Sequence, residues 1–489
     1  MEMERSCMWL CMCLAVAWAS TTYTIDTTHG PVTGQVQLLD DEHQVLVFYS
    51  IPFADPPVGD LRFKSPRPPS QNWTEPKDCT TASALRLCIQ LSLSKQLVLG
   101  TEDCLYLDIY VPLQGISDRP LPVMFWIFGG GYTIGDGYEF GWYDGKRLAH
   151  EKQVIVVVPN YRVNVLGFLA LNELKAEDPN HSTGNMALHD QRLALQWVQD
   201  NIAAFSGDPG RVTIFGESAG AFSVCWHLVS PASKGLFSAA IMESGTCSSW
   251  EFFQPLERAI AFGQEYALSI GCQDVDLSMS SIDVLACLRK LPSDDLIHSL
   301  FLLTDPDWPF VHQRPELLPP LSPLMPFGPA IDGVETGLLD FPQHLLDQGK
   351  FNRVPLILGT NKDEGSIFVL SVPSVARVSF PLDADSALTT VEHFFNESIS
   401  PVILNLYMNQ TDIYEFAISK LLNDYFFACP NRRIARAFNQ AGVSAFLYQF
   451  VYELRFIEAA LLGVYHTAEI DFVWNNQWPP LVRHSLYWF

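Results

Sequence analysis

Basic residues are scarce in this 489-residue chain, which has 30 lysines and arginines against 54 aspartates and glutamates and a formal net charge of −24. Nucleic-acid binding is therefore not expected, because it depends on clusters of basic side chains. The acidity fits a solvated surface that keeps a protein soluble, and it would also attract cationic substrates.

Linkers, repeats and long low-complexity tracts are also absent, so nothing divides the sequence into separate domains. With 48% hydrophobic and 17% charged residues, the chain can bury a large core and is not of disordered composition. Beyond the N-terminus, no segment approaches the roughly 18 uninterrupted apolar residues of a transmembrane helix.

The N-terminus is typical of a secretory signal peptide. Arg5 precedes an apolar stretch from Cys7 to Ala17, and Ala17-Trp18-Ala19 forms a small-residue cleavage site. A buried N-terminal helix is the less favoured alternative. We therefore expect a signal peptide at 1–19, a single domain at 20–489 and a secreted protein.

Three of the eleven cysteines (Cys7, Cys11 and Cys13) would leave with that peptide. No Cys-x-x-Cys pair occurs among the others, so neither zinc nor another metal is expected, whereas disulfides are usual in secreted proteins. N-glycosylation sequons, which agree with secretion, begin at Asn72, Asn180, Asn396 and Asn409.

The most informative motif is Gly216-Glu217-Ser218-Ala219-Gly220, which stands between an apolar β-type run and a helical segment. Gly-x-Ser-x-Gly in that context is typical of the nucleophile elbow of an α/β-hydrolase, where crowding at the turn requires glycine on both sides. A glycine-serine turn without chemistry is the alternative. The motif predicts Ser218 as a nucleophile at a helix N-terminus.

Apolar runs alternate with helical stretches, which predicts an α/β fold with a mostly parallel central sheet flanked by helices. We expect strands at Val123–Phe128, Val154–Pro159, Val212–Phe215, Ala239–Glu243, Pro355–Gly359 and Ser444–Val451, and helices at Met186–Phe205, 218–228 and Leu256–Ile270. Ligands bind beyond the carboxyl ends of such strands, and Ser218 lies at one of these ends.

A serine nucleophile needs a histidine base and a carboxylate that orients it, in the chain order Ser, acid, His for this fold. The strand predicted at Pro355–Gly359 leads into Asp363 and Glu364, and chain order alone leaves both open. His466 follows the last predicted strand by a short loop, as a catalytic base should.

Two other histidines come after the candidate acids. His393 precedes the last predicted strand and is expected on a helix surface, and His484 is too near the end of the chain to be placed. The oxyanion hole is expected at Gly129-Gly130-Gly131, because three glycines directly after a buried strand let a substrate approach their backbone N–H groups closely.

Together these segments resemble one family closely, the type-B carboxylesterase/cholinesterase family of α/β-hydrolases. The likeness runs from about residue 29 to about residue 475. Its landmarks are His29–Gly34, Ile51–Pro57, Leu61–Phe63, Glu102–Leu107, Gly129–Gly131, Asn160–Arg162, Phe215–Gly220, Phe327–Pro329, Lys362–Gly365 and His466–Ile470.

The resemblance implies a serine esterase that hydrolyses small carboxylic esters through an acyl-enzyme and needs no cofactor. It also chooses Glu364 over Asp363. The implied site residues are the triad Ser218, Glu364 and His466, the oxyanion hole of Gly130, Gly131 and Ala219, and Ser244 as a hydrogen-bonding support of the triad. Disulfides Cys88–Cys104 and Cys272–Cys287 are implied too, while the pairing of Cys79, Cys225, Cys247 and Cys429 stays open.

Several departures from the family pattern matter. Phe128 stands where carboxylesterases usually carry histidine, and the Cys88–Cys104 loop has no tryptophan, which argues against a cholinesterase. The chain continues for 23 residues after His466, so we expect a truncated C-terminal part. Trp250 is expected to line the acyl pocket.

The likeness to secreted carboxylesterases is the greater one, since no ER-retention ending of the H-x-E-L type is present. A catalytically silent adhesion or binding protein on the same scaffold is the alternative function. The oligomeric state and the acyl and alcohol specificity are not readable from the sequence.

Overall fold

The structure is a computed structural model, and it describes residues 21–39, 43–82, 86–92, 97–113, 119–138, 141–273, 283–300, 319–322, 324–453 and 462–476. The segment 1–19, predicted to be a signal peptide, and His484 lie outside these ranges.

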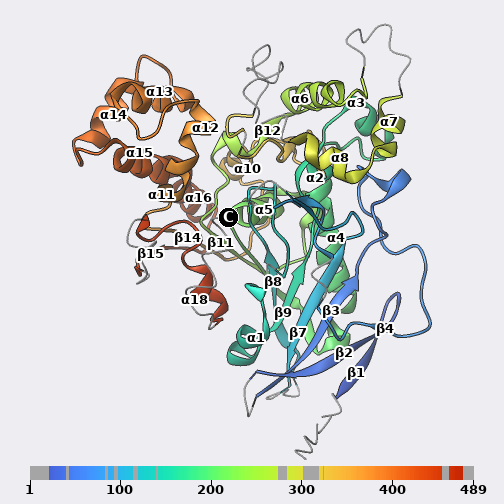
Figure 1. Cartoon of the computed structure of the whole chain (residues 1–489). Coiled ribbons are helices and arrows are strands. Elements are labelled where there is room, and N and C mark those ends of the chain that lie inside the picture. Colours follow the sequence, from blue (N-terminus) through green and yellow to red (C-terminus); the bar gives the residue numbers. More distant parts are fainter. Residues whose placement is uncertain are drawn as a thin grey trace, which may run out of the picture.

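An eleven-stranded sheet forms the centre of the fold (Figure 1). Its main path has the strand order β1-β2-β3-β7-β9-β8-β10-β11-β14-β15, with β4 beside β2. The strands are β1 (Thr22–Thr27), β2 (Gly30–Leu38), β3 (Gln44–Pro52), β4 (Lys77–Asp78), β7 (Tyr106–Pro112), β8 (Leu121–Ile127), β9 (Ile155–Pro159), β10 (Gly207–Glu217), β11 (Ala239–Glu243), β14 (Leu356–Asn361) and β15 (Ala445–Phe450). Two short ladders, β5 (Gln90–Leu91) with β6 (Val98–Leu99) and β12 (Gln254–Pro255) with β13 (Ala330–Ile331), lie outside it.

The two halves of the sheet differ from each other in strand direction. From β9 to β15 every neighbouring pair is parallel, as the alternation of strands and helices predicted. The main path from β1 to β9 is antiparallel, and the sequence reasoning missed its first four strands. The six predicted strands are all present, with boundaries that differ by a few residues at most, except that β10 begins five residues earlier, at Gly207.

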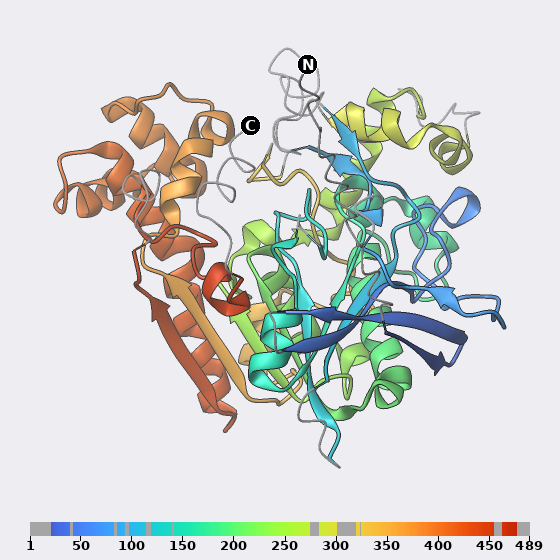
Figure 2. The same cartoon turned by 60° about the horizontal axis from the view of Figure 1, so that its bottom comes forward.

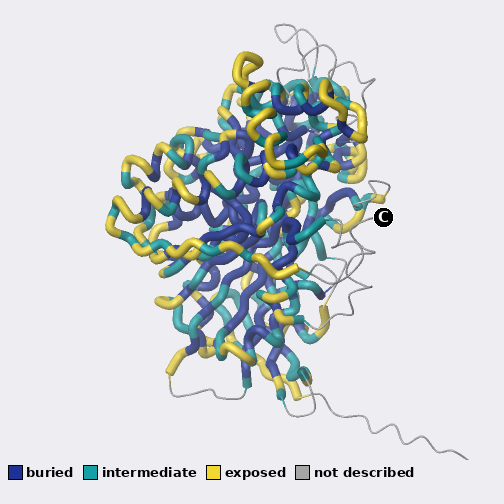
Figure 3. Tube along the Cα trace, turned by 90° about the vertical axis from the view of Figure 1, so that its left-hand side faces the viewer, coloured by how far each residue is buried: buried dark blue, intermediate teal, exposed yellow. Residues whose placement is uncertain are grey.

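The parallel strands form where apolar residues run without a break. All five residues of β9, Ile155-Val156-Val157-Val158-Pro159, are buried, as are Phe125, Trp126 and Ile127 at the end of β8. Such runs are expected in strands that are covered on both faces, because alternating polar residues would have no solvent to meet. Figure 3 shows the buried residues as a continuous band through the middle of the molecule.

Helices cover both faces of the sheet. The helices are α1 (Lys146–Lys152), α2 (Asn164–Phe168), α3 (Asn172–Glu177), α4 (Met186–Asn201), α5 (Ala219–Val229), α6 (Leu256–Ser269), α7 (Val284–Lys290), α8 (Ser293–His298), α10 (Pro342–Asp347), α11 (Gly365–Phe368), α12 (Val372–Ala376), α13 (Ala384–Phe394), α14 (Ser400–Met408), α15 (Tyr414–Asn423), α16 (Cys429–Gln440) and α18 (Ile470–Trp474). Helix α5 packs against β10 and β11, α16 packs against β15, and α1 packs against β7. Figure 2 shows α1 and α18 side by side in front of the sheet.

The three helices predicted from the sequence correspond to α4, α5 and α6, although the last turn of the first is a 3₁₀ segment at Ile202–Phe205. Helices α6 to α8 and α11 to α15 lie beyond the carboxyl ends of the parallel strands, in two groups (Figure 1). This is the side of the sheet on which Ser218 was expected.

Disulfides join Cys88 to Cys104 and Cys272 to Cys287, and a third joins Cys225 on α5 to Cys247, a pair that the sequence left open. Cys79 is a buried free thiol and Cys429 an exposed one. Across the described ranges, no helix combines the length and the apolar character needed to span a bilayer.

Candidate active site

Ser218 occupies a sharp turn between β10 and α5. Its backbone has φ 55° and ψ −123°. Residues that carry a side chain rarely adopt this strained conformation, and it persists only where the surrounding packing enforces it. The flanking glycines are required by space: a Cβ atom on Gly220 would lie 1.9 Å from the carbonyl oxygen of Ile127, and one on Gly216 would lie 2.5 Å from it. The half-buried Ser218 lines a mostly apolar cavity.

His466 lies in the segment between β15 and α18 and is 3% exposed. Its Nδ1 atom lies 2.7 Å from Oε2 of the buried Glu364, which follows β14. The other carboxyl oxygen of Glu364, Oε1, accepts a hydrogen bond from the backbone N–H of Asn361 at 2.7 Å. Because the hydrogen bond from Asn361 holds the carboxylate through Oε1, Oε2 can fix the orientation of the imidazole.

The neighbouring candidates take different positions. Asp363 Oδ2 accepts a hydrogen bond from the backbone N–H of Val464 at 2.9 Å, so this carboxylate fastens the loop that carries His466. The ring of His393 lies 2.7 Å, through Nε2, from the carbonyl oxygen of Pro320 and is exposed. The structure therefore brings Glu364 to His466 and leaves Asp363 and His393 away from the imidazole.

The three glycines that follow β8 line the same cavity as Ser218 and His466. Gly130 and Gly131 have φ angles of 95° and 62°, which favour glycine, and a Cβ atom on Gly130 would lie 2.3 Å from the carbonyl oxygen of Ile134. Ala219, whose N–H was expected in the oxyanion hole, is the first residue of α5 and is fully buried.

A cluster of buried carboxyl groups surrounds His466, and the sequence reasoning did not foresee it. Glu217, Glu243, Glu364 and Glu469 are each at most 3% exposed. Oε1 of Glu217 lies 3.1 Å from Nε2 of His466, the imidazole nitrogen opposite Glu364. Burial, and then the charges of Glu469 and Glu364, raise the pKa of Glu217 well above its usual range.

Ser244 contacts this cluster. Its hydroxyl donates a hydrogen bond to Oε1 of Glu469 at 3.0 Å, and the side-chain amide of Asn361 donates to Oε2 at 2.5 Å. Burial and then the neighbouring Glu364 raise the pKa of Glu469 to about 7. Ser244 therefore hydrogen-bonds to Glu469, which lies next to the expected triad but is not a member of it.

The cavity above Ser218 has a volume of about 480 Å³ and mostly apolar walls. Its apolar side chains come mainly from α5, from the segments near Phe252 and Met325, and from α11, α12, α13 and α15. A π-helical turn at Asp424–Ala428 adds two adjacent aromatic rings. The apolar lining residues are Leu91, Ile134, Trp142, Tyr143, Phe222, Phe252, Leu321, Leu324, Met325, Ile367, Phe368, Val372, Val375, Phe394, Leu422, Phe426, Phe427 and Ile470.

Trp250 does not take the place expected for it. Its side chain is 47% exposed, and Phe252, two residues later, lines the cavity instead. The rings of Phe252 and Phe222 lie 4.0 Å apart, which closes the cavity beside α5. A 3₁₀ turn at Trp250–Phe252 turns the tryptophan outward, a local feature that residue spacing alone did not indicate.

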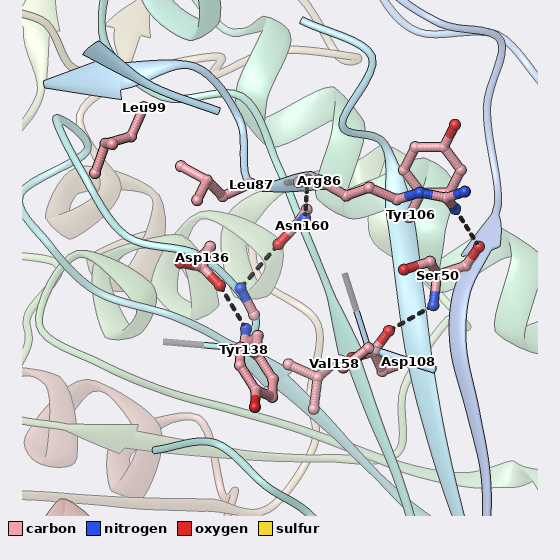
Figure 4. A pocket seen from close by; sticks show the side chains of 12 residues that line it. Ser50, Arg86, Leu87, Leu99, Tyr106, Asp108, Asp136, Tyr138, Val158 and Asn160 are labelled. Atoms are coloured by element: carbon pink, nitrogen blue, oxygen red, sulfur yellow. Dashed lines mark hydrogen bonds between the residues drawn. The ribbon is translucent and has the colours of Figure 1, made fainter. Parts of the chain in front are cut away.

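A smaller cavity of about 170 Å³ has both apolar and charged side chains in its wall and is lined by neither Ser218 nor His466 (Figure 4). In it, Asp108 accepts a hydrogen bond from the backbone N–H of Ser50 at 2.7 Å, and Arg86 donates to the carbonyl oxygen of Ser50 at 3.0 Å. Burial, and then the charges of Asp136 and Asp144, raise the pKa of Asp108 to about 7.

The strand order, the turn at Ser218 and the position of His466 define an α/β-hydrolase. A model of the "Carboxylesterase family" matches residues 21–483. The chain is 34% identical to acetylcholinesterase of Electrophorus electricus over 94% of its length and 76% of that protein, and 33% identical to carboxylesterase 1D of Mus musculus over 92% of its length and 80% of that protein. A solved PNB esterase has a TM-score of 0.72 and 29% identity over 93% of this chain and 85% of its own. The chain belongs to the carboxylesterase family.

Proposed function

We propose that this carboxylic ester hydrolase acts through Ser218, His466 and Glu364 and a covalent acyl-enzyme. The observation that carries the proposal is the distance of 2.7 Å between His466 Nδ1 and Glu364 Oε2. His466 lines the same cavity as Ser218. A hydrogen bond at Nδ1 places the imidazole proton there and leaves Nε2 free to act as the base.

In the proposed reaction, His466 takes the proton of Ser218 while the serine oxygen attacks the ester carbonyl. The backbone N–H groups of Gly130, Gly131 and Ala219 stabilise the tetrahedral oxyanion. The imidazolium then protonates the leaving alcohol, and a water molecule, activated by the same imidazole, hydrolyses the acyl-enzyme. Glu364 stabilises the imidazolium in both steps.

Glu217 lies on the other side of the imidazole, with Oε1 3.1 Å from Nε2 of His466. Burial, and then the charges of Glu469 and Glu364, raise the pKa of Glu217 well above its usual range, which favours the uncharged carboxylic acid. An uncharged group at this point of the cavity wall is compatible with apolar, uncharged substrates.

We also propose that the protein is secreted, with a signal peptide at 1–19 and a single catalytic domain at 20–489. The sequon residues Asn72, Asn180, Asn396 and Asn409 are all exposed, as glycosylation requires. Three disulfides fit an oxidising compartment.

Hydrolysis of a short-chain p-nitrophenyl ester by the secreted chain and its Ser218→Ala variant tests the proposal. We expect kcat to fall by at least ~10⁴-fold in the variant, because the members of a triad act as a unit. Circular dichroism would establish that both proteins are folded. Near-normal hydrolysis by the variant, or a folded wild type without activity, would contradict the assignment.

A further inference from the structure

Two aromatic rings lie against the imidazole of His466. The ring centroid of Phe368, at the end of α11, is 4.9 Å from that of His466, and the centroid of Phe427 is 5.2 Å from it. The rings of Phe368 and Phe427 are stacked, with their centroids 5.6 Å apart. Because the three separations are similar, the rings form a closed triangle in which each one packs against the other two.

Phe427 reaches the imidazole from the π-helical turn at Asp424–Ala428, between α15 and α16. With its i→i+5 hydrogen bonds, such a turn is wider than an α-helical one, and turns of this kind are frequent at functional sites. The side chain of Phe427 is 2% exposed. Its ring is therefore held on its other sides by the protein around it.

The segment that carries Phe427 is fastened to the segment that carries Glu364. The side-chain oxygen of Asn423, the residue before the π-helical turn, accepts a hydrogen bond from the backbone N–H of Glu364 at 3.3 Å. Helix α11 packs directly on α15 (Figure 1), where a Cβ atom on Gly365 would lie 1.9 Å from the carbonyl oxygen of Ser419. The two rings and the carboxylate therefore belong to one closely packed unit.

A hydrogen bond at one atom does not fix the plane of a ring. Glu364 holds Nδ1 of His466, whereas Nε2, which faces Glu217, makes no hydrogen bond with the described residues. The imidazole could pivot about its one hydrogen bond unless packing prevents it. A displacement of about 1 Å can cost on the order of 10²-fold in rate.

From this geometry we infer that Phe427 is a positioning residue, which keeps the imidazole of His466 in the orientation that lets Nε2 face Ser218. The inference rests on the proposed function, in which the same imidazole acts in acylation and in deacylation. Loss of the Phe427 ring should therefore lower kcat whichever of the two steps limits the rate, and for every ester alike.

The test compares Phe427→Leu with Phe426→Leu on p-nitrophenyl acetate and p-nitrophenyl butyrate. Leucine keeps an apolar side chain and removes the flat ring. Phe426 lines the same cavity and is 5% exposed, but within the described ranges its ring makes no contact with that of His466. For Phe427→Leu we expect kcat to fall roughly 10- to 100-fold, equally for both esters, with little change in KM. Phe426→Leu should act mainly on KM, and differently on the two acyl chains.

A spectroscopic measurement follows the imidazole without any substrate. The Nδ1 proton of His466, hydrogen-bonded to Glu364, should give a low-field proton NMR signal that is absent in His466→Ala. We expect this proton to exchange with solvent at least about tenfold faster in Phe427→Leu, because local opening of the site becomes easier. In Phe426→Leu the exchange rate should stay near that of the wild type.

Two further variants at position 427 keep the test decisive. Phe427→Tyr retains the ring and should retain most of the kcat and the slow exchange of the Nδ1 proton. If Phe427→Leu does not fold, Phe427→Met replaces it, because a flexible methionine fills the space without a ring and should give the same pattern of losses. Circular dichroism establishes which variants are folded.

Three results would overturn the inference. A raised KM with an unchanged kcat in Phe427→Leu would make Phe427 part of the cavity wall alone. Losses that differ between the two esters would place its ring against the acyl chain. An unchanged exchange rate of the Nδ1 proton would show that the imidazole is held without it. If the wild type cleaved neither ester, the proposed function would fail, while the NMR comparison would still test the positioning of His466.

Discussion

His466 Nδ1 and Glu364 Oε2 lie 2.7 Å apart across 102 residues of sequence, and the second oxygen of Glu364 is occupied by the backbone N–H of Asn361. The carboxylate therefore has two acceptor positions with two different donors. Any change that turns one of these acceptors into a donor must disturb the imidazole, because the contact with Asn361 fixes which oxygen faces it.

The first prediction concerns Glu364→Gln. Its carbonyl oxygen should stay on the N–H of Asn361, so its NH₂ group would face Nδ1 of His466 and force the proton of the imidazole onto Nε2. A base with that tautomer cannot accept the proton of Ser218, and we expect kcat to fall by about 10³- to 10⁴-fold with little loss of stability. Steady-state kinetics and thermal unfolding measure the two effects.

Asp363→Asn is the matched control, since an asparagine oxygen can still accept from the backbone N–H of Val464. Its kcat should remain near that of the wild type. A larger loss in Asp363→Asn than in Glu364→Gln would reverse the assignment of the acid.

The second prediction concerns the turn at Ser218. In Gly220→Ala, the new Cβ atom would lie 1.9 Å from the carbonyl oxygen of Ile127, which is backbone and cannot swing aside. We expect a loss of stability of at least ~3 kcal/mol or no folded protein, from overpacking at a buried site. In Gly328→Ala the nearest atom would be 3.6 Å away, so denaturant midpoints of the two variants should differ clearly. Equal midpoints would show that the turn can relax.

The third prediction concerns the buried ion pair of Arg162 and Asp190, whose side chains are 4% and 0% exposed and which make two hydrogen bonds of 2.7 and 2.8 Å. Arg162→Met would leave the carboxylate buried without its cation and should cost about 3–5 kcal/mol in unfolding free energy. Adding Asp190→Leu should recover much of that loss, because the uncompensated charge is then gone. If the double variant were as unstable as the single one, packing rather than charge would be the cause.

The fourth prediction concerns the pH dependence of stability. Glu469 has a pKa of about 7 in the folded protein against 4.5 as its ordinary value, so the folded state holds more protons between these values. The stabilisation is complete below pH 4.5 and is lost as the pH rises through about 7. Glu469→Gln, which cannot ionise, should therefore raise the Tm at pH 8 relative to the wild type and flatten the profile between pH 5 and 8.

Asp108, whose pKa is also about 7, should leave a residual slope in that variant. The exposed Glu453→Gln serves as the control and should follow the wild-type profile. An unchanged slope in Glu469→Gln would mean that Glu469 titrates near its ordinary pKa in the folded protein.

Sequence reasoning succeeded where a local pattern carries the structural requirement. The elbow at Ser218 needs a strand, two glycines and a helix within a few residues, and β10 and α5 form there. It failed where contacts join distant segments with no pattern of their own. The buried carboxyl groups of Glu217 and Glu469 come from β10 and from the segment before α18. No pattern in the sequence around either residue indicates that its side chain is buried.

The wall of the cavity shows the same limit. Trp142 lies in this wall, and its hydrogen bond to Asp471 spans 329 residues of sequence. The Cys225–Cys247 bridge could not be chosen among the open cysteines, because its closure depends on how α5 and the segment after β11 pack. The place of Phe426 and Phe427 in the cavity wall depends on a π-helical turn, for which the sequence has no reliable signature.

The order of the strands along the chain also determines when each of the proposed triad residues is synthesised. The proposed nucleophile follows β10, the proposed acid follows β14, and the proposed base follows β15, a strand at one edge of the sheet. A chain that has been synthesised as far as α16 contains Ser218 and Glu364 but not His466. On the proposed assignment, a nascent chain therefore lacks its catalytic base until its last sheet strand has been synthesised, so ester hydrolysis has to wait for the end of translation.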